Sequence, residues 1–271
     1  MRRARAAIAC RIRRPALCAA RVLPALAAAL GLAVAVAHSG EGLYLSWNDC
    51  ASGGGASRLT SACDTNAGSR RLYCAFRLPL PLDQVLGIEV VVDLQAEGAT
   101  LPDWWHLEPA NPASGTPPGC RYGSLSASQN FTGDTGCADF WHDAGSAVVQ
   151  GYTPGDPPGG AARARIKAAV ALSSPDVASL DDTRMYYGVK LVLDDAKTVD
   201  PGSCAGCFTN VCLVLNAVWI KRAPGAAGGD RLLETPGSGN ANWATWQGTT
   251  QDCVAVPVRR TTWGQLKSLY R

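Results

Sequence analysis

The run Val85–Leu94 constrains the fold of this chain more than any other segment. Its ten residues, Val-Leu-Gly-Ile-Glu-Val-Val-Val-Asp-Leu, are mostly apolar and β-branched, and Glu89 is the one charged residue before Asp93. Such a run predicts a strand that is buried on both faces or nearly so. At about 3.3 Å per residue the strand would be roughly 30 Å long, enough to cross a small β-sandwich once.

The first 37 residues differ in composition from the rest of the chain. Seven arginines precede an apolar run from Val22 to Ala37, no acidic residue is present, and the run ends in Ala-Val-Ala. These features predict a cleaved secretory signal peptide at residues 1–37. An uncleaved anchor is the alternative, but about 16 apolar residues containing Pro24 are short for a spanning helix. We therefore expect a secreted or extracytoplasmic protein, in the periplasm or at the cell surface, without a transmembrane segment after cleavage.

Removal of this leader changes the net charge of the chain. The full sequence has 25 basic and 22 acidic residues, and without the seven leader arginines the balance becomes 18 against 22. A mature chain with a small negative charge lacks the basic surface that phosphate backbones select. The sequence therefore argues against nucleic acid as a partner.

The mature chain, residues 38–271, keeps nine of the eleven cysteines. In an exported chain this set predicts a disulfide framework, and because nine is odd, one thiol is unpaired or pairs between molecules. Cys74 is our candidate for the unpaired thiol, because it lies on the apolar side of a predicted strand. The other eight are the disulfide candidates: Cys50, Cys63, Cys120, Cys137, Cys204, Cys207, Cys212 and Cys253.

Spacing gives a first guess at how these eight cysteines pair. A zinc site that uses the last four cysteines is an alternative, but no histidine lies near them in the sequence. A redox Cys-x-x-Cys normally opens a helix, whereas a strand pattern follows here. We therefore predict structural disulfides, with no metal and no cofactor. The pairings suggested by proximity are Cys50–Cys63, Cys120–Cys137, Cys207–Cys212 and Cys204–Cys253.

Alternation of apolar and polar residues predicts further strands along the mature chain. In Ala162–Leu172 the alanine content leaves helix as an alternative, although the strict period of two favours a strand. Near the end of the sequence, Thr262 and Gln265 fit a capping box that would start a short helix. The other predicted strands are Leu43–Trp47, Arg71–Leu80, Ala147–Tyr152, Met185–Asp194, Val211–Arg222, Arg231–Glu234 and Asn242–Trp246.

Long β segments separated by glycine and proline loops predict one all-β domain over residues 38–271. We expect a two-sheet antiparallel sandwich of jelly-roll or cohesin-like type. Residues 98–160, which are rich in turns and aromatic residues, would form a disulfide-stapled insertion. Residues 259–271 would form a basic tail with the short C-terminal helix, which either docks on the sandwich or presents Trp263 and Leu266 to a partner.

Two resemblances accompany this pattern. Val85–Leu94 and Gly160–Ala168 are similar to strands of cohesin-like and related carbohydrate-binding sandwich modules, which implies a sandwich of that type. The mature chain as a whole resembles secreted bacterial proteins of unassigned function that share the motifs at Leu45–Cys50 and Thr262–Arg271. That second resemblance implies a compartment and a fold but no activity. The chain departs from the carbohydrate-binding modules in its greater length and its cysteine content.

The insertion carries two Trp-His motifs with flanking carboxylates, and these are the candidate ligand-binding residues. Indole faces stack on sugar rings and carboxylates accept hydrogen bonds from hydroxyls, so the motifs could form a glycan platform. The alternative is that the tryptophans pack beneath the insertion as core. The candidates are Asp103, Trp104, Trp105, His106 and Glu108 in the first motif, and Asp139, Trp141 and His142 in the second.

We expect a non-catalytic binding or structural module for a glycan or a cell-surface protein, in an unknown oligomeric state. The alternative is a secreted glycan hydrolase, which needs two carboxylates roughly 5 to 10 Å apart. Ser-His-Asp catalysis has little support, because the chain has three histidines and no Gly-x-Ser-x-Gly elbow. For the hydrolase, the carboxylate pair would come from Asp103, Glu108, Asp139 and Asp143.

Overall fold

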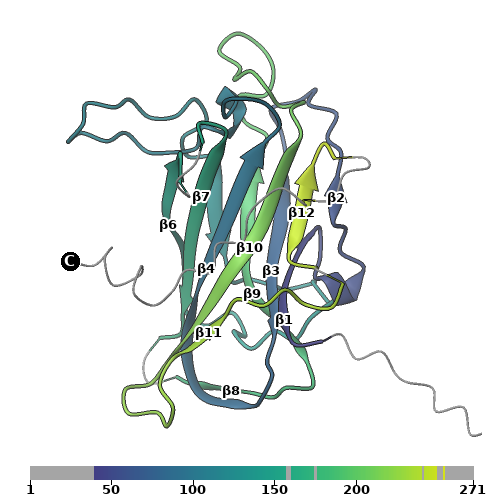
Figure 1. Ribbon diagram of the computed structural model, residues 1–271, viewed down its shortest axis with the longest axis vertical. Coiled ribbons are helices and arrows are strands. Elements are labelled where there is room, and N and C mark those ends of the chain that lie inside the picture. Colours follow the sequence, from purple (N-terminus) through teal and green to yellow (C-terminus); the bar gives the residue numbers. More distant parts are fainter. Residues whose placement is uncertain (1–39, 157–159, 174–175, 240, 249–252, 254–271) are drawn as a thin grey trace, which may run out of the picture. The chain divides into compact units, whose positions relative to one another are not determined.

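The computed structural model describes residues 40–156, 160–173, 176–239, 241–248 and 253, which form two β-sheets (Figure 1). They belong to one compact unit, residues 38–271. The all-β, two-sheet class predicted from the sequence is confirmed. Within these described ranges, no helix has the length and apolar character needed to cross a membrane.

The smaller sheet has four strands in the order β1-β3-β9-β5 and the larger sheet follows the order β2-β12-β10-β4-β7-β6. Two short strands extend the larger sheet, β11 beside β10 and β8 beside β4. All paired strands are antiparallel except β12 and β2, which are parallel. The strands are β1 (Gly42–Trp47), β2 (Arg58–Leu59), β3 (Ser69–Arg77), β4 (Leu82–Ala96), β5 (Leu125–Ser128), β6 (Ser146–Pro154), β7 (Arg163–Ala171), β8 (Ala178–Leu180), β9 (Met185–Asp194), β10 (Val211–Arg222), β11 (Arg231–Leu233) and β12 (Trp243–Trp246).

The long alternating segments became strands where the sequence placed them. β9 and β10 match their predicted bounds, and residues 163–171 are a strand, so the helix alternative for that segment is wrong. Strands β2, β5 and β8 were not predicted, because two to four residues are too few to show a period. The predicted C-terminal helix lies outside the described residues.

The apolar run that constrains the fold lies in β4, between β10 and β7 in the larger sheet (Figure 1). Ile88, Val90 and Val92 face the core and are fully buried. On the opposite face Glu89 and Val91 are only half-buried. The predicted burial of this strand is therefore complete on its core face and partial on its outer face.

Asp93, on the outer face of β4, is a buried carboxylate with a full set of partners. Arg165 of β7 donates to both its oxygens, at 2.6 and 2.9 Å, and Asn216 of β10 donates to Oδ2 at 2.6 Å. The hydrogen bonds to Asp93 raise the pKa of Arg165, so the guanidinium stays charged. Because a buried charge is tolerated only when it is paired and hydrogen-bonded, this network fixes the register of three adjacent strands.

A loop segment, residues 131–137, covers the outer face of the smaller sheet. The ring of Phe131 stacks on Tyr187 with 4.4 Å between centroids, and Lys190 pairs with Asp134 at 2.9 Å. The amide of Gly136 donates to the Tyr187 hydroxyl at 2.8 Å. We call this segment the strap. It buries aromatic side chains on the outside of β3 and β9, which explains why nearly all of β9 is buried.

Four disulfides connect all eight candidate cysteines, and Cys74 is the free, buried one. All four pairings guessed from spacing are wrong. The observed bonds close loops of 41 to 144 residues, because the sheets bring together strand ends and loops that are distant in sequence. No zinc thiolates remain, since the last four cysteines each belong to a bond. The pairs are Cys50–Cys137, Cys63–Cys207, Cys120–Cys204 and Cys212–Cys253.

These pairings predict one free thiol that is unreactive in the folded protein. Burial raises the pKa of Cys74, so its sulfur stays protonated and out of reach of a thiol reagent. In the mature chain, a chromogenic disulfide reagent should detect no thiol before denaturation and one thiol per chain after it. Rapid reaction of the native protein, or three thiols after denaturation, would contradict this assignment.

Loss of the disulfide that closes the largest loop should destabilise the domain strongly. Cys63 and Cys207 are 144 residues apart, so the double variant Cys63→Ala/Cys207→Ala should lose about 4 to 5 kcal/mol of unfolding free energy on the chain-entropy model. Urea unfolding of the mature chain measures the loss. Cys74→Ala, which removes a buried thiol but no cross-link, should cost only about 1 kcal/mol. Equal losses would contradict the account.

Candidate functional site

The two tryptophans of the first predicted motif form core, not surface. Trp104 and Trp105 lie in a short 3-10 helix, Asp103–Trp105, and both are fully buried. Trp104 stacks on Trp246 with 4.7 Å between ring centroids, and Trp105 meets Trp246 edge-on at 5.9 Å. Indoles without exposed faces cannot stack on a sugar. These two tryptophans therefore pack in the core, as the alternative interpretation of the motif had it.

Trp141, in the second motif, is buried as well. Its indole Nε1 donates to the carbonyl oxygens of Tyr187 at 3.1 Å and Gly188 at 3.0 Å, which ties the loop to β9. The Asp139 carboxylate accepts from the Trp141 amide at 2.9 Å and shapes the local turn. His142 and Asp143 are exposed beside it with positive φ angles.

The two motifs lie at opposite ends of β9. The second contacts Tyr187 and Gly188, near the start of the strand. The first lies beside Arg121, which donates to the carbonyl oxygen of Asp194 at the end of β9. The roughly seven residues between these contacts correspond to about 20 Å. A carboxylate pair with one member from each motif therefore cannot span the 5 to 10 Å that glycoside hydrolysis needs.

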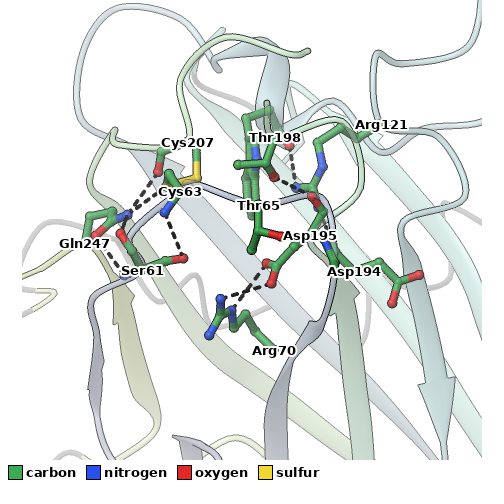
Figure 2. A network of polar contacts seen from close by, with 12 residues as sticks. Ser61, Cys63, Thr65, Arg70, Arg121, Asp194, Asp195, Thr198, Cys207 and Gln247 are labelled. Carbon is green, nitrogen blue, oxygen red and sulfur yellow. Dashed lines mark hydrogen bonds and ion pairs between the residues drawn. A yellow bond between two sulfur atoms is a disulfide. The ribbon is translucent and has the colours of Figure 1, made fainter. Parts of the chain in front are cut away.

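Three loops meet where β9 and β4 end and β10 begins, and we call them the stapled end: residues 61–68, 97–124 and 195–210. Two disulfides join them, Cys63–Cys207 and Cys120–Cys204, each with 6.0 Å between Cα atoms. Figure 2 shows Gln247 beside the first bond, where its amide donates to Ser61 O at 2.8 Å and accepts from Ser61 N at 3.1 Å. The loops are thus fixed to each other covalently and to β12 by hydrogen bonds.

Arg121 is the buried centre of the stapled end (Figure 2). Its guanidinium lies 3.5 Å from the centroid of the Trp104 ring. It donates to three carbonyl oxygens, those of Trp104 at 3.0 Å, Ala196 at 2.9 Å and Asp194. Burial lowers the pKa of Arg121 to about 10, so the side chain remains charged at neutral pH. One cation therefore joins the insertion, β9 and the loop after it.

Polar contacts hold the loop after β9 on its other side. Arg70 pairs with the nearly buried Asp195 at 3.0 Å, as the facing side chains in Figure 2 show. The Thr198 hydroxyl donates to Asp195 O at 2.6 Å and accepts from Trp104 Nε1 at 3.1 Å. Asn66 accepts from the amide of Thr198 at 2.7 Å. The loop is therefore ordered by side chains from β3, the 61–68 segment and the insertion.

On this rigid base the stapled end exposes two aromatic side chains. Phe208, directly after Cys207, is 71% exposed, and Tyr122, two residues after Cys120, is 58% exposed. His106 and Glu108 lie on the same loops, with 2.7 Å between Nδ1 and Oε1. Glu108 Oε2 is buried and has no hydrogen-bond partner in the described part of the chain. Of the residues predicted from the sequence at this end, Asp103 is exposed and the His106–Glu108 pair is half-buried.

Sequence reasoning missed Phe208 and Tyr122. Both are single aromatic residues in loops without a period, so no pattern distinguished them. The signal that was present is their position: each follows a disulfide cysteine by one or two residues, where the backbone is fixed and a large side chain has few ways to reach the core.

The opposite end of the molecule has a small groove between the β3–β4 turn and the β10–β11 turn. Its volume is about 170 Å³, below the range of roughly 300 to 1,000 Å³ typical of small-molecule sites. Leu80 is 67% exposed in it. Leu80 in this groove is therefore a suitable control position for a binding experiment at the stapled end.

Comparison with known proteins found no matching family model, no matching curated protein and no matching solved structure. The interpretation of the stapled end therefore depends on its own geometry.

Arg121→Met should destabilise the domain by about 3 kcal/mol or more, because three buried carbonyl oxygens lose their donor. Urea unfolding followed by tryptophan fluorescence measures this loss, since Trp104 lies against the guanidinium. The matched control is Arg184→Met: the Arg184 side chain is 67% exposed and pairs with the nearby Asp181, so that variant should behave as wild type. Similar stability of the two variants would show that Arg121 does not hold the loops together.

Proposed function

We propose that this protein is an extracytoplasmic, non-catalytic binding module that engages a glycan or a surface protein through the stapled end. The observation that carries the proposal is the exposure of Phe208 and Tyr122 on loops that two disulfides and the buried Arg121 immobilise. Large aromatic side chains contribute most of the energy at many binding surfaces. When their loops are already rigid, binding loses little conformational entropy.

The compartment follows from the same framework. Four disulfides fit an extracellular location, since such bonds form and persist in oxidising compartments. A binding surface made of loops at one end of a β-sandwich also fits the general rule that rigid sheets position functional loops. Hydrolysis is not proposed, because the two carboxylate-bearing motifs are separated by the length of β9.

The chemistry of each accessible side chain at the stapled end indicates its role in binding. Phe208 and Tyr122 would supply apolar faces that stack on a sugar ring or fill a pocket of a partner protein. The His106–Glu108 pair would supply polar contacts through the exposed parts of its side chains, which are 30% and 16% exposed. Trp104 and Trp105 support this surface from below.

The test is a glycan-array and envelope-protein screen with the mature protein, followed by titration of each ligand found. Phe208→Ala and Tyr122→Ala should each weaken binding about tenfold or more, the usual effect of losing an aromatic anchor. Leu80→Ala is the matched control, because it removes an equally exposed apolar side chain from the opposite end.

Two results would overturn the proposal. One is binding that is unchanged by both aromatic substitutions, or that Leu80→Ala weakens equally, which would place the ligand elsewhere. The other is the absence of binding to every glycan and every envelope protein in the screen.

A further inference from the structure

The stapled end carries the whole net negative charge of residues 38–271. That range contains 22 acidic and 18 basic residues. Six of the acidic and two of the basic residues lie in the three loops of the stapled end, so the rest of the range has sixteen of each. The six acidic residues are Asp64, Glu97, Asp103, Glu108, Asp195 and Asp200, and the two basic residues are Arg121 and Lys197. A surface whose charges share one sign selects its partners by charge as well as by shape.

The two positive charges of the stapled end are held against its own backbone. Arg121 is fully buried, and its guanidinium donates to three carbonyl oxygens. Lys197 is exposed, but its ammonium donates to Cys120 O at 2.7 Å. Among the acidic residues, Asp195 is buried and pairs with Arg70. The exposed ones are Asp64, Glu97, Asp103 and Asp200, so the accessible charge of this end is negative.

Two of the exposed carboxylates belong to residues that are fixed next to Phe208. Asp64 and Phe208 each directly follow one cysteine of the Cys63–Cys207 bond, so the disulfide holds the two residues close together. Glu97 accepts a hydrogen bond from Asn210 Nδ2 at 2.6 Å, two residues after Phe208. The exposed phenyl ring therefore has a negative charge beside it from each of two other loops.

A third carboxylate, that of Asp103, is fixed on the approach to Phe208. The next residue, Trp104, donates its amide hydrogen to Ala205 O at 2.9 Å. This bond holds Asp103 beside the segment that leads into Phe208.

Tyr122 also has an exposed carboxylate nearby. The amide of Asp194, the last residue of β9, donates to Ser124 O at 2.9 Å, two residues after Tyr122. Asp194 is exposed, and Figure 2 shows its carboxylate directed away from Arg121. Both exposed aromatic rings of the stapled end therefore lie among negative charges.

An apolar ring bordered by carboxylates fits a side chain that is apolar along its length and positive at its end. Arginine and lysine have this construction, because their stems pack on apolar surface and their charged heads reach carboxylates. The faces of aromatic rings attract the same cations. The hydroxyls of a neutral sugar gain nothing from the net charge of the surface, and an acidic glycan is repelled by it.

We infer that the partner of the stapled end is a basic protein segment, whose arginine and lysine side chains lie on Phe208 and Tyr122 and pair with the surrounding carboxylates. The inference rests on the proposed function and chooses between its two classes of ligand. An amino-sugar polymer is also positive, but its amines are attached directly to the rings, without an apolar stem to lie across a phenyl group. Two copies of this chain joined through their stapled ends would bring like charges together.

Synthetic probes test the charge of the partner directly. The basic probe is a fluorescein-labelled peptide of repeated Gly-Ser-Arg units, and its counterpart has glutamate in place of arginine. A labelled chitosan oligosaccharide represents the amino sugars. Fluorescence anisotropy with the oxidised mature protein should show binding of the basic peptide and none of the acidic one. Binding of the basic peptide should weaken about tenfold between roughly 50 and roughly 200 mM salt, because salt screens exposed charges.

Substitutions that remove charge but keep shape locate the binding. The triple variant Asp64→Asn/Glu97→Gln/Asp103→Asn should weaken binding of the basic peptide about tenfold, the combined effect of losing three exposed ion pairs. Phe208→Ala should weaken it about as much, through loss of an aromatic anchor. The matched control is Asp83→Asn/Asp143→Asn/Asp176→Asn, which removes three exposed negative charges outside the stapled end and should bind as wild type.

Four results would overturn the inference. They are the absence of binding to the basic peptide, binding that does not change with salt, equal weakening by the two triple variants, and tighter binding of the chitosan oligosaccharide than of the basic peptide. The third would mean that binding follows the net charge of the protein and not this surface, and the fourth that the partner is an amino sugar.

The aromatic variants separate this inference from the proposed function. A neutral glycan that binds through Phe208 and is unaffected by the acidic triple variant would overturn the inference and leave the proposed function standing. Binding of the basic peptide that is weakened neither by Phe208→Ala nor by Tyr122→Ala would contradict both.

Discussion

A two-layer sandwich buries the inner faces of its sheets, and both sheets of this protein also carry apolar or aromatic residues on their outer faces. Tyr73 and Tyr187 on the smaller sheet, and Val91 and Val214 on the larger, need cover from something other than the opposing sheet. Segments without regular structure supply that cover for the smaller sheet. Such segments gain little from backbone pairing, so covalent cross-links must fix their position. The need for cover outside the sandwich thus explains the position of Cys50–Cys137, which ties the strap to the smaller sheet.

The aromatic residues of the two Trp-His motifs also combine packing with the positioning of loops. Its tryptophans close one end of the sandwich and one side of β9, and the loops that carry them are held by Arg121 and by the disulfides. Because the tryptophans of the two motifs are buried in the core, the accessible side chains are those of neighbouring residues such as Phe208, Tyr122 and the His106–Glu108 pair. A functional surface built this way sits on a base that cannot reorganise easily.

The sequence was informative about strands and uninformative about what joins them. Long, mostly apolar runs located β9 and β10 to the residue. Alternation along β3 also placed Cys74 on the buried side and so identified the unpaired thiol. Disulfide partners and tryptophan burial depend on which strand ends meet in space. No local pattern encodes that Cys63 lies beside Cys207, or that Trp104 stacks on Trp246.

The burial of Cys74 has a consequence for how the chain matures. In the oxidising compartment proposed for this protein, any of the nine thiols of the mature chain can be captured in a wrong bond while the chain is still open. Cys74 is withdrawn from that exchange when β3 pairs with β9, where it lies opposite Val189. Closing of the smaller sheet before oxidation is complete would leave eight sulfurs to pair, an even number, and would keep Cys74 out of wrong bonds.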